Sequence, residues 1–396
     1  MRRILYVQYT NPAGYPPLEH SSRILADRGW EVQFLGSGAS GDADAFKFAE
    51  HPRIRTERWR YSGPGWQQKA HYAGFCLWTW WRAWRSGARW IYASEPLACP
   101  AALLASRLPG RRVIYHEHDS PSVNDASPFF RRILGARRRL CQRAAAVVLP
   151  NAERARVFTE MIRPTCPVLT VWNCPELREV CAALPTPPTE PVLFYHGSLN
   201  PARLPLAVLH ALALVPGRPR LHFAGYTTSG HRDFLDTFLA EAARLGLADR
   251  VQYLGAPATR AELLRLCSQA SLGLAFMPAA SGDLNMRAMT GASNKPFDYL
   301  ACGLSLLVSD LPDWHAMFVE PGYARACNPE DPHSIAEAVG WFLSHPQVAA
   351  AARARGRQRL LDEWNYETQF APVLRLMAGA AGEATSSPTN LPGLSQ

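Results

Sequence analysis

Residues 192–225 read VLFYHGSLNPARLPLAVLHALALVPGRPRLHFAG, which has the pattern of a strand, a helix and a second strand. The strands are the short apolar runs Val192–His196 and Leu221–Ala224, and a glycine follows each of them. Leu204–Leu214 lies between them and has the length and apolar content of a helix. Because parallel neighbouring strands need a long crossover, this unit predicts a parallel α/β sheet.

The same alternation occurs in both halves of the chain. Near the N-terminus, strand Ile4–Thr10, helix Leu18–Arg28 and strand Val32–Leu35 follow one another. Between the halves lies the run LPTPPTEP, whose prolines are typical of an interdomain linker. The sequence therefore predicts an α/β fold with two doubly wound Rossmann-like domains that face a central cleft. The predicted divisions are residues 1–183 for the first domain, 184–191 for the linker, 192–364 for the second domain and 383–396 for a disordered tail.

Of the 396 residues, 47% are hydrophobic and 19% are charged, and this composition excludes general disorder. No apolar run reaches about 18 residues, so we expect no ordinary transmembrane helix. The apolar stretch in the start, MRRILYVQYTNP, is too short and too polar for a signal peptide. The nine cysteines form no CxxC pair, which favours reduced thiols in a cytoplasmic protein over disulfides or a zinc site.

The formal charge is +9, and the basic excess is concentrated in residues 51–150, which contain 17 basic and 5 acidic residues. Such a region indicates an anionic partner, either a phosphorylated acceptor, a membrane surface or a nucleic acid. The alternative is a composition biased towards arginine, since only three of the 42 basic residues in the whole chain are lysines. Nucleic acid is the weakest of these options, because no recognised nucleic-acid-binding motif accompanies the charge.

The segment SNKPFDYLACG contains the first candidate site. Ser293 or Asn294 can cap a helix there, and Pro296 suits its first turn. A helix N-terminus favours anions, and Lys295 adds a full positive charge. Asp298 can accept hydrogen bonds from the hydroxyls of a sugar or a ribose. The alternative is an ordinary capped helix with a surface lysine.

The segment HGSLNPAR contains the second candidate. Gly197 ends the strand, and Arg203 follows six residues later, so both are expected beside the same cleft. Arginine can bind phosphate oxygens through two parallel hydrogen bonds. Alone, Arg203 is more typical of a solvated residue at a helix start. Together with the Lys295 helix, it favours an anion site.

The segment YHEHDS, after the strand Val113–Tyr115, contains the third candidate. A metal site there is disfavoured, because alternate residues of an extended chain point to opposite faces. A second alternative is a histidine that is bonded inside the core. We favour His118 or Asp119 in contact with a substrate.

The segment FCLWTWWRAWRSGARW, residues 75–90, contains five tryptophans and three arginines. We favour a helix that packs between domain elements, with the tryptophans in the core. The alternative is a helix in a membrane interface, with its arginines directed to lipid phosphates, which fits a lipid-linked acceptor.

The order of these segments resembles that of the retaining glycosyltransferases of family 4, which have the GT-B fold. The resemblance covers roughly residues 1–380. His118 and Asp119 resemble the His-Asp pair on the acceptor side, and Trp364–Tyr366 resembles the segment before a helix, about 365–380, that crosses back to the first domain. Further positions resemble the donor side, where the family binds the nucleotide sugar; these are Gly14, Gly197, Ser198, Arg203, Gly225, Leu254, Gly255, Asn294, Lys295 and Asp298.

Four positions depart from the family pattern. Ser198 stands where the family has arginine, and Arg203 stands where it has lysine. Asp298 replaces the second glutamate of an E-x7-E motif, whose first glutamate would fall at Thr290. One of two cations that normally flank the diphosphate is thus missing, and the contacts to the sugar are left open.

The resemblance implies a retaining transferase that moves a sugar from a nucleotide sugar to a glycan or lipid-linked acceptor. It implies no cofactor and no metal, with Arg203, Lys295, His118 and Asp119 as catalytic residues. The expected role is in synthesis of cell-envelope or extracellular polysaccharide, in the cytoplasm or at the inner face of an anionic membrane. The alternatives are an epimerase or hydrolase of the same fold and a non-catalytic protein that binds nucleotide sugars or polyanions.

Overall fold

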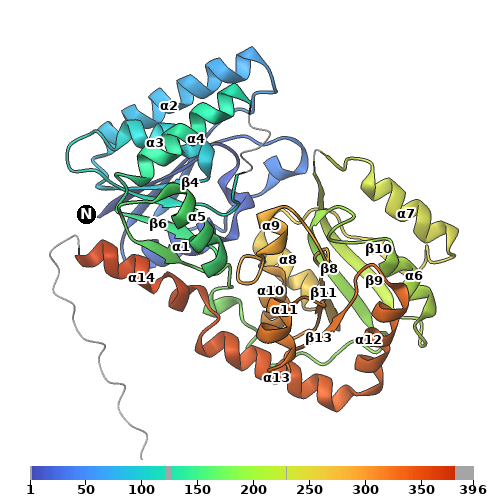
Figure 1. Cartoon of the computed structure of the whole chain (residues 1–396). Helices are drawn as coiled ribbons and strands as arrows, with labels where there is room; N and C mark the ends of the chain where they lie inside the picture. Colours follow the sequence, from blue (N-terminus) through green and yellow to red (C-terminus); the bar gives the residue numbers. More distant parts are fainter. Residues whose placement is uncertain (1, 122–126, 229, 380–396) are drawn as a thin grey trace, which may run out of the picture.

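The computed structural model describes residues 2–121, 127–228 and 230–379, so the predicted disordered tail, 383–396, lies outside the described residues. Two parallel sheets, each covered by helices on both faces, form two domains side by side (Figure 1). Within the described residues, no helix combines the length and the apolar composition needed to span a bilayer. The predicted α/β class with two Rossmann-like domains is confirmed.

The first sheet has seven strands in the order β3-β2-β1-β4-β5-β6-β7, all paired in parallel. Its inner strands contain continuous runs of buried residues because helices cover both faces of the sheet. The strands are β1 (Arg3–Gln8), β2 (Glu31–Ser37), β3 (Ile54–Trp59), β4 (Trp90–Ser94), β5 (Arg112–His116), β6 (Ala146–Leu149) and β7 (Val168–Thr170).

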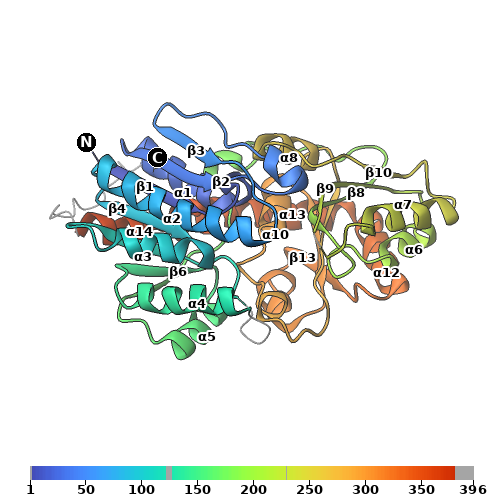
Figure 2. The same ribbon diagram turned by 90° about the horizontal axis from the view of Figure 1, so that it is seen from above.

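Helices cover the first sheet in two layers. Figure 2 shows α2, α3 and α4 side by side in one layer, and α3 packs against both of its neighbours. The other face is covered by α1 together with α14, which comes from the end of the chain. The bounds are α1 (Pro16–Asp27), α2 (Trp66–Ser86), α3 (Cys99–Ala105), α4 (Pro128–Cys141), α5 (Ala152–Ile162) and α14 (Tyr366–Gly379).

The second sheet has six strands in the order β10-β9-β8-β11-β12-β13. The strands are β8 (Val192–Leu199), β9 (Arg220–Thr227), β10 (Val251–Tyr253), β11 (Leu272–Ala275), β12 (Ser305–Ser309) and β13 (Ala324–Cys327). The helices are α6 (Ala207–Leu214), α7 (Phe234–Arg244), α8 (Arg260–Cys267), α9 (Leu284–Arg287), α10 (Lys295–Ala301), α11 (Pro312–Trp314), α12 (Pro332–Ser344) and α13 (Pro346–Asp362).

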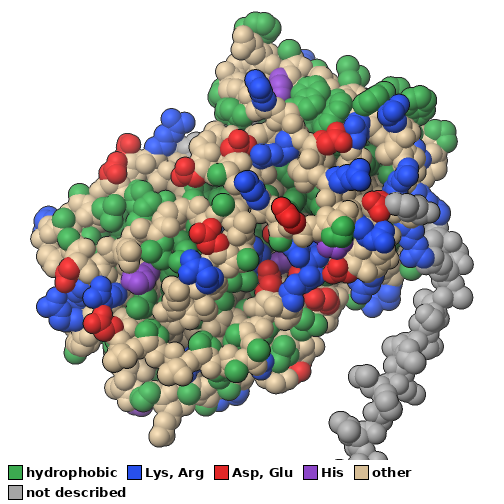
Figure 3. Space-filling model, turned by 180° about the vertical axis from the view of Figure 1, so that it is seen from behind, with side chains coloured by type: hydrophobic (Ala, Val, Ile, Leu, Met, Phe, Trp, Pro, Cys, Tyr) green, Lys and Arg blue, Asp and Glu red, His purple; other side chains and the backbone are tan. Residues whose placement is uncertain are grey.

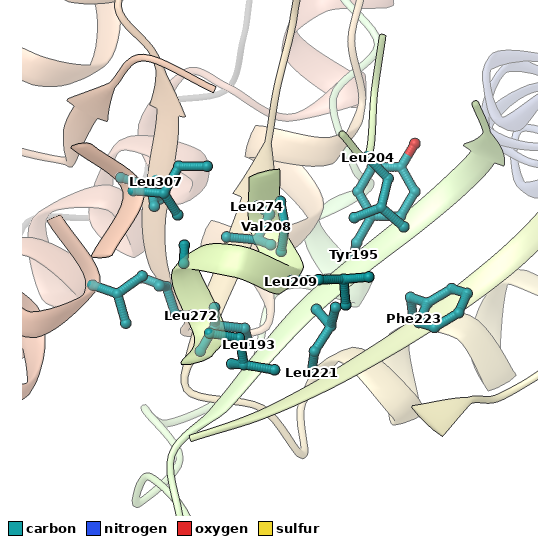
Figure 4. Close-up of a cluster of buried hydrophobic side chains, with 14 of the residues drawn as sticks. Leu193, Tyr195, Leu204, Val208, Leu209, Leu221, Phe223, Leu272, Leu274 and Leu307 are labelled. Carbon is teal, nitrogen blue, oxygen red and sulfur yellow. The ribbon is translucent and has the colours of Figure 1, made fainter. Parts of the chain in front are cut away.

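The strand-helix-strand unit of residues 192–225 forms the centre of the second core. Figure 4 shows Leu193 on β8, Leu221 on β9 and Leu209 on α6 directed toward one another. Full burial of one such leucine contributes about 1.5–3 kcal/mol. This core fixes the C-terminal ends of β8 and β9, where the candidate site begins.

The chain returns to the first domain through α14. Tyr366, Phe370, Val373 and Met377 are spaced so that they share one face of this helix, and all are buried against the first sheet. A helix at the place expected from Trp364–Tyr366 therefore joins the two domains a second time. The exact limits of the predicted domains stay a prediction.

Two strands were not predicted from the sequence, and both lie at sheet edges. β3 carries the mixed sequence IRTERW, in which three of six residues are exposed, and β13 ends the second sheet. An edge strand is covered by neighbours on fewer sides than an inner strand, so it lacks the continuous apolar run that identifies a buried strand.

The expectation that the tryptophans of residues 75–90 belong to the core is wrong for three of them. Trp80, Trp81 and Trp84 on α2 are exposed, whereas Trp90 on β4 is buried. The nine cysteines are free thiols, buried or half-buried. The surface of α2 is considered again below.

Candidate active site

A cleft of about 440 Å³ lies between the two domains. Its walls are loops that follow the C-terminal ends of parallel strands, which is where open α/β sheets bind ligands. The N-terminal wall includes residues 10–17 after β1 and His118 and Asp119 after β5; the C-terminal wall includes residues 196–198, Arg203, Ala224–Tyr226, 256–260 and 292–295.

Two glycines shape the C-terminal wall. Gly197 on β8 lies opposite Gly225 on β9, with φ of +110° and +151°. A Cβ on Gly225 would lie 1.8 Å from the carbonyl oxygen of Gly197, and a Cβ on Gly197 would lie 3.1 Å from Lys295 Nζ. Glycine is therefore required at both positions, because side chains would occupy the space that the backbone and Lys295 fill.

Lys295 and Arg203 meet at this wall. The ammonium of Lys295 lies 5.5 Å from the centre of the Tyr195 ring, and the guanidinium of Arg203 contacts Met277 Sδ. Burial, and secondly the charge of Arg203, lower the pKa of Lys295 to about 7. Among the described residues, no carboxylate forms an ion pair with either side chain. Two neighbouring cations without an anion favour binding of a ligand that brings its own negative charge.

The helix that carries Lys295 differs from the prediction at its start. Asn294 occupies the N-cap position of α10, but neither it nor Ser293 caps the helix through its side chain. The Asn294 amide instead donates to Asp298 Oδ2 over 3.0 Å. Pro296 lies in the first turn, as expected. Because α10 has only seven residues, the positive potential here comes mainly from the two side-chain cations.

Asp298 is fully buried and does not line the cleft. Its Oδ1 accepts a 2.6 Å hydrogen bond from Arg260, whose Nε donates to Glu179 over 2.6 Å. His20 of α1 lies 3.1 Å from the same Glu179. Burial raises the pKa of Asp298, and Arg260 opposes that effect. These contacts give Asp298 a structural role between the domains, and its contact with ligand hydroxyls stays a prediction.

His118 lies on the N-terminal wall. Its Nε2 is 3.0 Å from Ser94 Oγ, and its buried Nδ1 has no hydrogen-bond partner among the described residues. Burial, and secondly the nearby guanidinium of Arg154, lower the pKa of His118 to about 3. The imidazole is therefore neutral near pH 7 and can donate or accept a hydrogen bond, but it lacks the second ring proton with which an imidazolium acts as a general acid. Asp119 beside it has a largely exposed side chain.

Two residues that the sequence analysis missed hold the His118–Asp119 turn. The Glu95 Oε1 accepts hydrogen bonds from the backbone N–H of His118, at 2.7 Å, and of Asp119, at 3.3 Å. Glu95 has φ of 69°, a strained value for a residue with a side chain. Burial raises its pKa. The only local signal for Glu95 is its position directly after a buried strand.

Arg154 on α5 holds the turn from the other side and connects it to the second domain. It is buried, and its Nη1 donates to the carbonyl oxygen of His118 over 2.6 Å. Its Nε donates to the carbonyl oxygen of Ala288, and its Nη2 to that of Asn285, over 2.9 and 3.0 Å. No sequence pattern identifies these contacts, because His118 lies 36 residues away and the partners in the second domain, Asn285 and Ala288, lie 131 and 134 residues away.

The other predicted site residues differ in whether they line the cleft. Gly14, Ser198 and Asn294 line it. A Cβ on Gly14 would lie 3.6 Å from Phe46 Cδ2, an ordinary contact, so the fold itself does not require glycine there. Leu254 and Gly255 lie behind the wall, and the residues that follow them line it. No group of three or more metal-ligating side chains is found in the described part of the chain.

Solved structures of similar fold cover nearly the whole chain. Sucrose-phosphate synthase from Thermosynechococcus elongatus is 15% identical, with a TM-score of 0.70, and the match covers 96% of this chain and all of that one. HepE from Anabaena, solved with UDP-glucose, is 17% identical, with a TM-score of 0.69 and the same coverage. A trehalose-6-phosphate protein from E. coli, bound with UDP-2-fluoro glucose, is 15% identical, with a TM-score of 0.67, and the match covers 94% of this chain and 98% of that one.

Family models extend this likeness from the fold to the sequence. A glycosyl transferase 4-like domain matches residues 18–174, and a glycosyl transferase-like domain matches residues 207–375. No curated protein matches the sequence. The two family matches cover the strands of the two sheets from β2 and from β9 onward, and they include most of the residues that line the cleft. The chain therefore belongs to the family 4-like glycosyltransferases with the GT-B fold.

Proposed function

We propose that the protein transfers a sugar from a nucleoside diphosphate sugar to a glycan or lipid-linked acceptor with retention of the anomeric configuration. The proposed role is polysaccharide synthesis for the cell envelope or the exterior, from the cytoplasmic side. The observation that carries the proposal is the pair Arg203 and Lys295, two cations in one cleft without a carboxylate partner among the described residues.

In this proposal the two cations stabilise the leaving group. Breaking the bond between the sugar and the nucleotide leaves negative charge on the diphosphate. Cations placed beforehand in a cleft with little water stabilise that charge more strongly than bulk solvent does. The proposal therefore requires no metal ion, and transfer is expected to continue in the presence of EDTA.

His118 takes a positioning and hydrogen-bonding role in the same proposal. Its neutral ring and its unpartnered Nδ1 suit a hydrogen bond to a hydroxyl of the transferred sugar. The acceptor hydroxyl then attacks from the side of the leaving diphosphate, which keeps the configuration at the anomeric carbon. Asp119 lies beside this position and is proposed to contact the acceptor.

The test is sugar transfer by Arg203→Ala and Lys295→Ala, with UDP-glucose as the first donor because similar structures were solved with it or its analogue. Loss of one well-placed donor to a developing anion costs about 3 kcal/mol, so each variant is expected to lose about 100-fold in kcat. Arg265→Ala, which removes an exposed arginine from α8, is the matched control and should keep full activity.

Three outcomes would contradict the proposal. If both cleft variants retain transfer within about threefold, far less than the expected cost, the diphosphate does not bind between these cations. Turnover of the nucleotide sugar without any acceptor would indicate a hydrolase or epimerase. Donor binding without turnover on any acceptor would indicate a binding protein. Retention is tested separately, by the anomeric configuration of the product in NMR spectra.

A further inference from the structure

The surface of α2 has an exposed aromatic stripe. Leu77, Trp80, Trp81 and Trp84 are spaced at i, i+3, i+4 and i+7, so they share one side of the helix, and 37–61% of each side chain is exposed. The opposite side of α2 is buried in the first domain. Every tryptophan that is exposed in the described residues lies on this helix. An apolar stripe of this kind is unusual on a surface that contacts only water.

Arginines accompany the stripe. The guanidinium groups of Arg82 and Arg85 lie over the Trp81 ring, at 5.8 and 5.7 Å from its centre. Figure 3 shows hydrophobic and basic side chains mixed along the upper edge of the molecule, on the side of the N-terminal domain. Arg82 is also ion-paired with Glu57, whereas Arg85 forms no ion pair with a described residue, so its guanidinium remains available to an anion.

A second basic row lies on α4, in the same helical layer. Arg131, Arg132, Arg138 and Arg139 are exposed, whereas Ile133 is buried. None of the four arginines forms an ion pair with a described residue. α2 and α4 flank α3 in one helical layer (Figure 2), and both the aromatic stripe and the arginine row are exposed on helices of that layer. This surface, α2 together with α4, is called the α2–α4 face below.

We propose that the α2–α4 face binds the surface of an anionic phospholipid bilayer. Indole rings are favoured at the level of the lipid headgroups, because each has an apolar body and one N–H donor. Arginines near an anionic leaflet pair with lipid phosphates. The stripe supplies the indoles, and the row on α4 supplies the charges. The combination of indole rings and unpaired arginines favours an anionic bilayer as the partner of this face, since a purely apolar partner would leave the arginines without anions.

The inference does not depend on the reaction proposed above. It concerns a face outside the cleft, and none of its residues lines the cleft. Loss of bilayer binding and loss of sugar transfer to a soluble acceptor can therefore be observed separately. Failure of one proposal would leave the other standing.

The experiment is co-sedimentation of the full chain with two kinds of vesicle at low salt. One is phosphatidylcholine mixed with phosphatidylglycerol, and the other is phosphatidylcholine alone. We expect binding to the anionic vesicles, weakened by added salt because charges at a surface are screened. The variant Trp80→Ser/Trp84→Ser should bind at least about tenfold more weakly. The control Leu214→Ser/Val348→Ser removes exposed apolar side chains from the second domain and should bind like the wild type.

A second variant tests the charges. Arg131→Gln/Arg138→Gln should lose roughly tenfold or more in affinity for anionic vesicles, because each arginine near such a surface adds about fivefold. Circular dichroism and binding of UDP-glucose check that all variants are folded. The proposal is overturned if the wild type does not bind anionic vesicles at low salt, or if the tryptophan variant binds equally well. It is also overturned if the wild type binds no vesicle and is a dimer that this variant dissociates, because the occupant is then a second copy of the chain.

Discussion

The charged and polar side chains of the two cleft walls differ in whether they have partners within the protein. On the C-terminal wall, Lys295 and Arg203 lie beside bare glycine backbone, with no carboxylate partner among the described residues. On the N-terminal wall, the turn at His118 is held by the Glu95 carboxylate and the Arg154 guanidinium, and its histidine is neutral near pH 7. The difference indicates that one wall supplies charge to a ligand and the other supplies position.

The same contrast appears in what each wall demands of its backbone. At Gly225 the neighbouring strand approaches so closely that no side chain fits, whereas at Gly14 a methyl group has room. A wall that brings backbone and cations together in a small space is sensitive to added volume. The predictions below test whether the two walls differ in this way, from the largest expected effect to the smallest.

The largest effect is expected for Gly225→Ala compared with Gly14→Ala. The new Cβ on Gly225 would lie 1.8 Å from the carbonyl oxygen of Gly197, so β8 and β9 must separate. We expect a loss of about 3 kcal/mol in the free energy of unfolding, and weaker binding of UDP-glucose. Gly14→Ala should change stability by less than about 0.5 kcal/mol. Urea unfolding measures the free energy of unfolding of both variants. If both lose the same stability, the two walls do not differ in their tolerance of added volume.

A smaller effect is expected on the N-terminal wall from Glu95→Ala. This change removes the acceptor of two backbone N–H groups, which costs about 2 kcal/mol. The turn at His118 then loses its position, so kcat for transfer should fall about tenfold. Affinity for UDP-glucose, measured by calorimetry, should stay within about twofold, because the cations on the other wall are unchanged.

Glu95→Gln is the matched control for this prediction, since its amide oxygen can still accept from the turn. It should recover most of the lost rate. If Glu95→Gln and Glu95→Ala are equally slow, the hydrogen bonds to the turn are not the cause. A parallel loss of donor affinity would show that the two walls do not have separate roles.

The smallest effect concerns pH and the C-terminal wall. The pKa of Lys295 is lowered to about 7, so its ammonium is charged below pH 7 and becomes neutral as the pH rises above it. A diphosphate binds the charged form, and affinity for UDP-glucose should therefore fall on the order of tenfold between pH 6.5 and 8.5. UDP-glucose is the suitable probe, because its phosphates do not titrate in this range.

Lys295→Arg provides the comparison, because a guanidinium stays charged over the whole range. Its affinity for UDP-glucose should be nearly independent of pH, whatever its absolute value. An unchanged pH dependence in this variant would mean that another group causes the titration. A pH-independent wild type would contradict the role of Lys295 as a ligand cation.

Much of the fold was predictable from the sequence, and the failures have a common cause. Inner strands such as β1 and β8 contain continuous buried apolar runs, residues 4–7 and 192–195, so they were found, whereas the edge strands β3 and β13 were missed. The tryptophans of α2 were assigned to the core because composition does not tell which side of a helix is covered. Burial depends on neighbours, and α2 packs against α3 and β1 on one side only, which leaves Trp80, Trp81 and Trp84 exposed on the other side.

Some residues of the candidate site were also predictable from local sequence, and others were not. A glycine at a strand end, a cation a few residues after that strand and a cation at a helix start are local patterns, and they led to Gly197, Arg203 and Lys295. Glu95 and Arg154 were not found, because each acts through backbone groups of a distant loop. The contact of Asp298 with a ligand stays a prediction, and only the structure shows that its carboxylate accepts a hydrogen bond from Arg260.

By itself, the sequence determined the alternation of strands and helices, the division into two halves and the positions where glycine and positive charge recur. These are properties of neighbouring residues, set by backbone sterics and by the periodicity of apolar side chains. Only the tertiary structure decided which charges are neutralised and which remain for a ligand. The energy of a buried charge depends on the partners and the solvent around it, and folding alone brings those partners together.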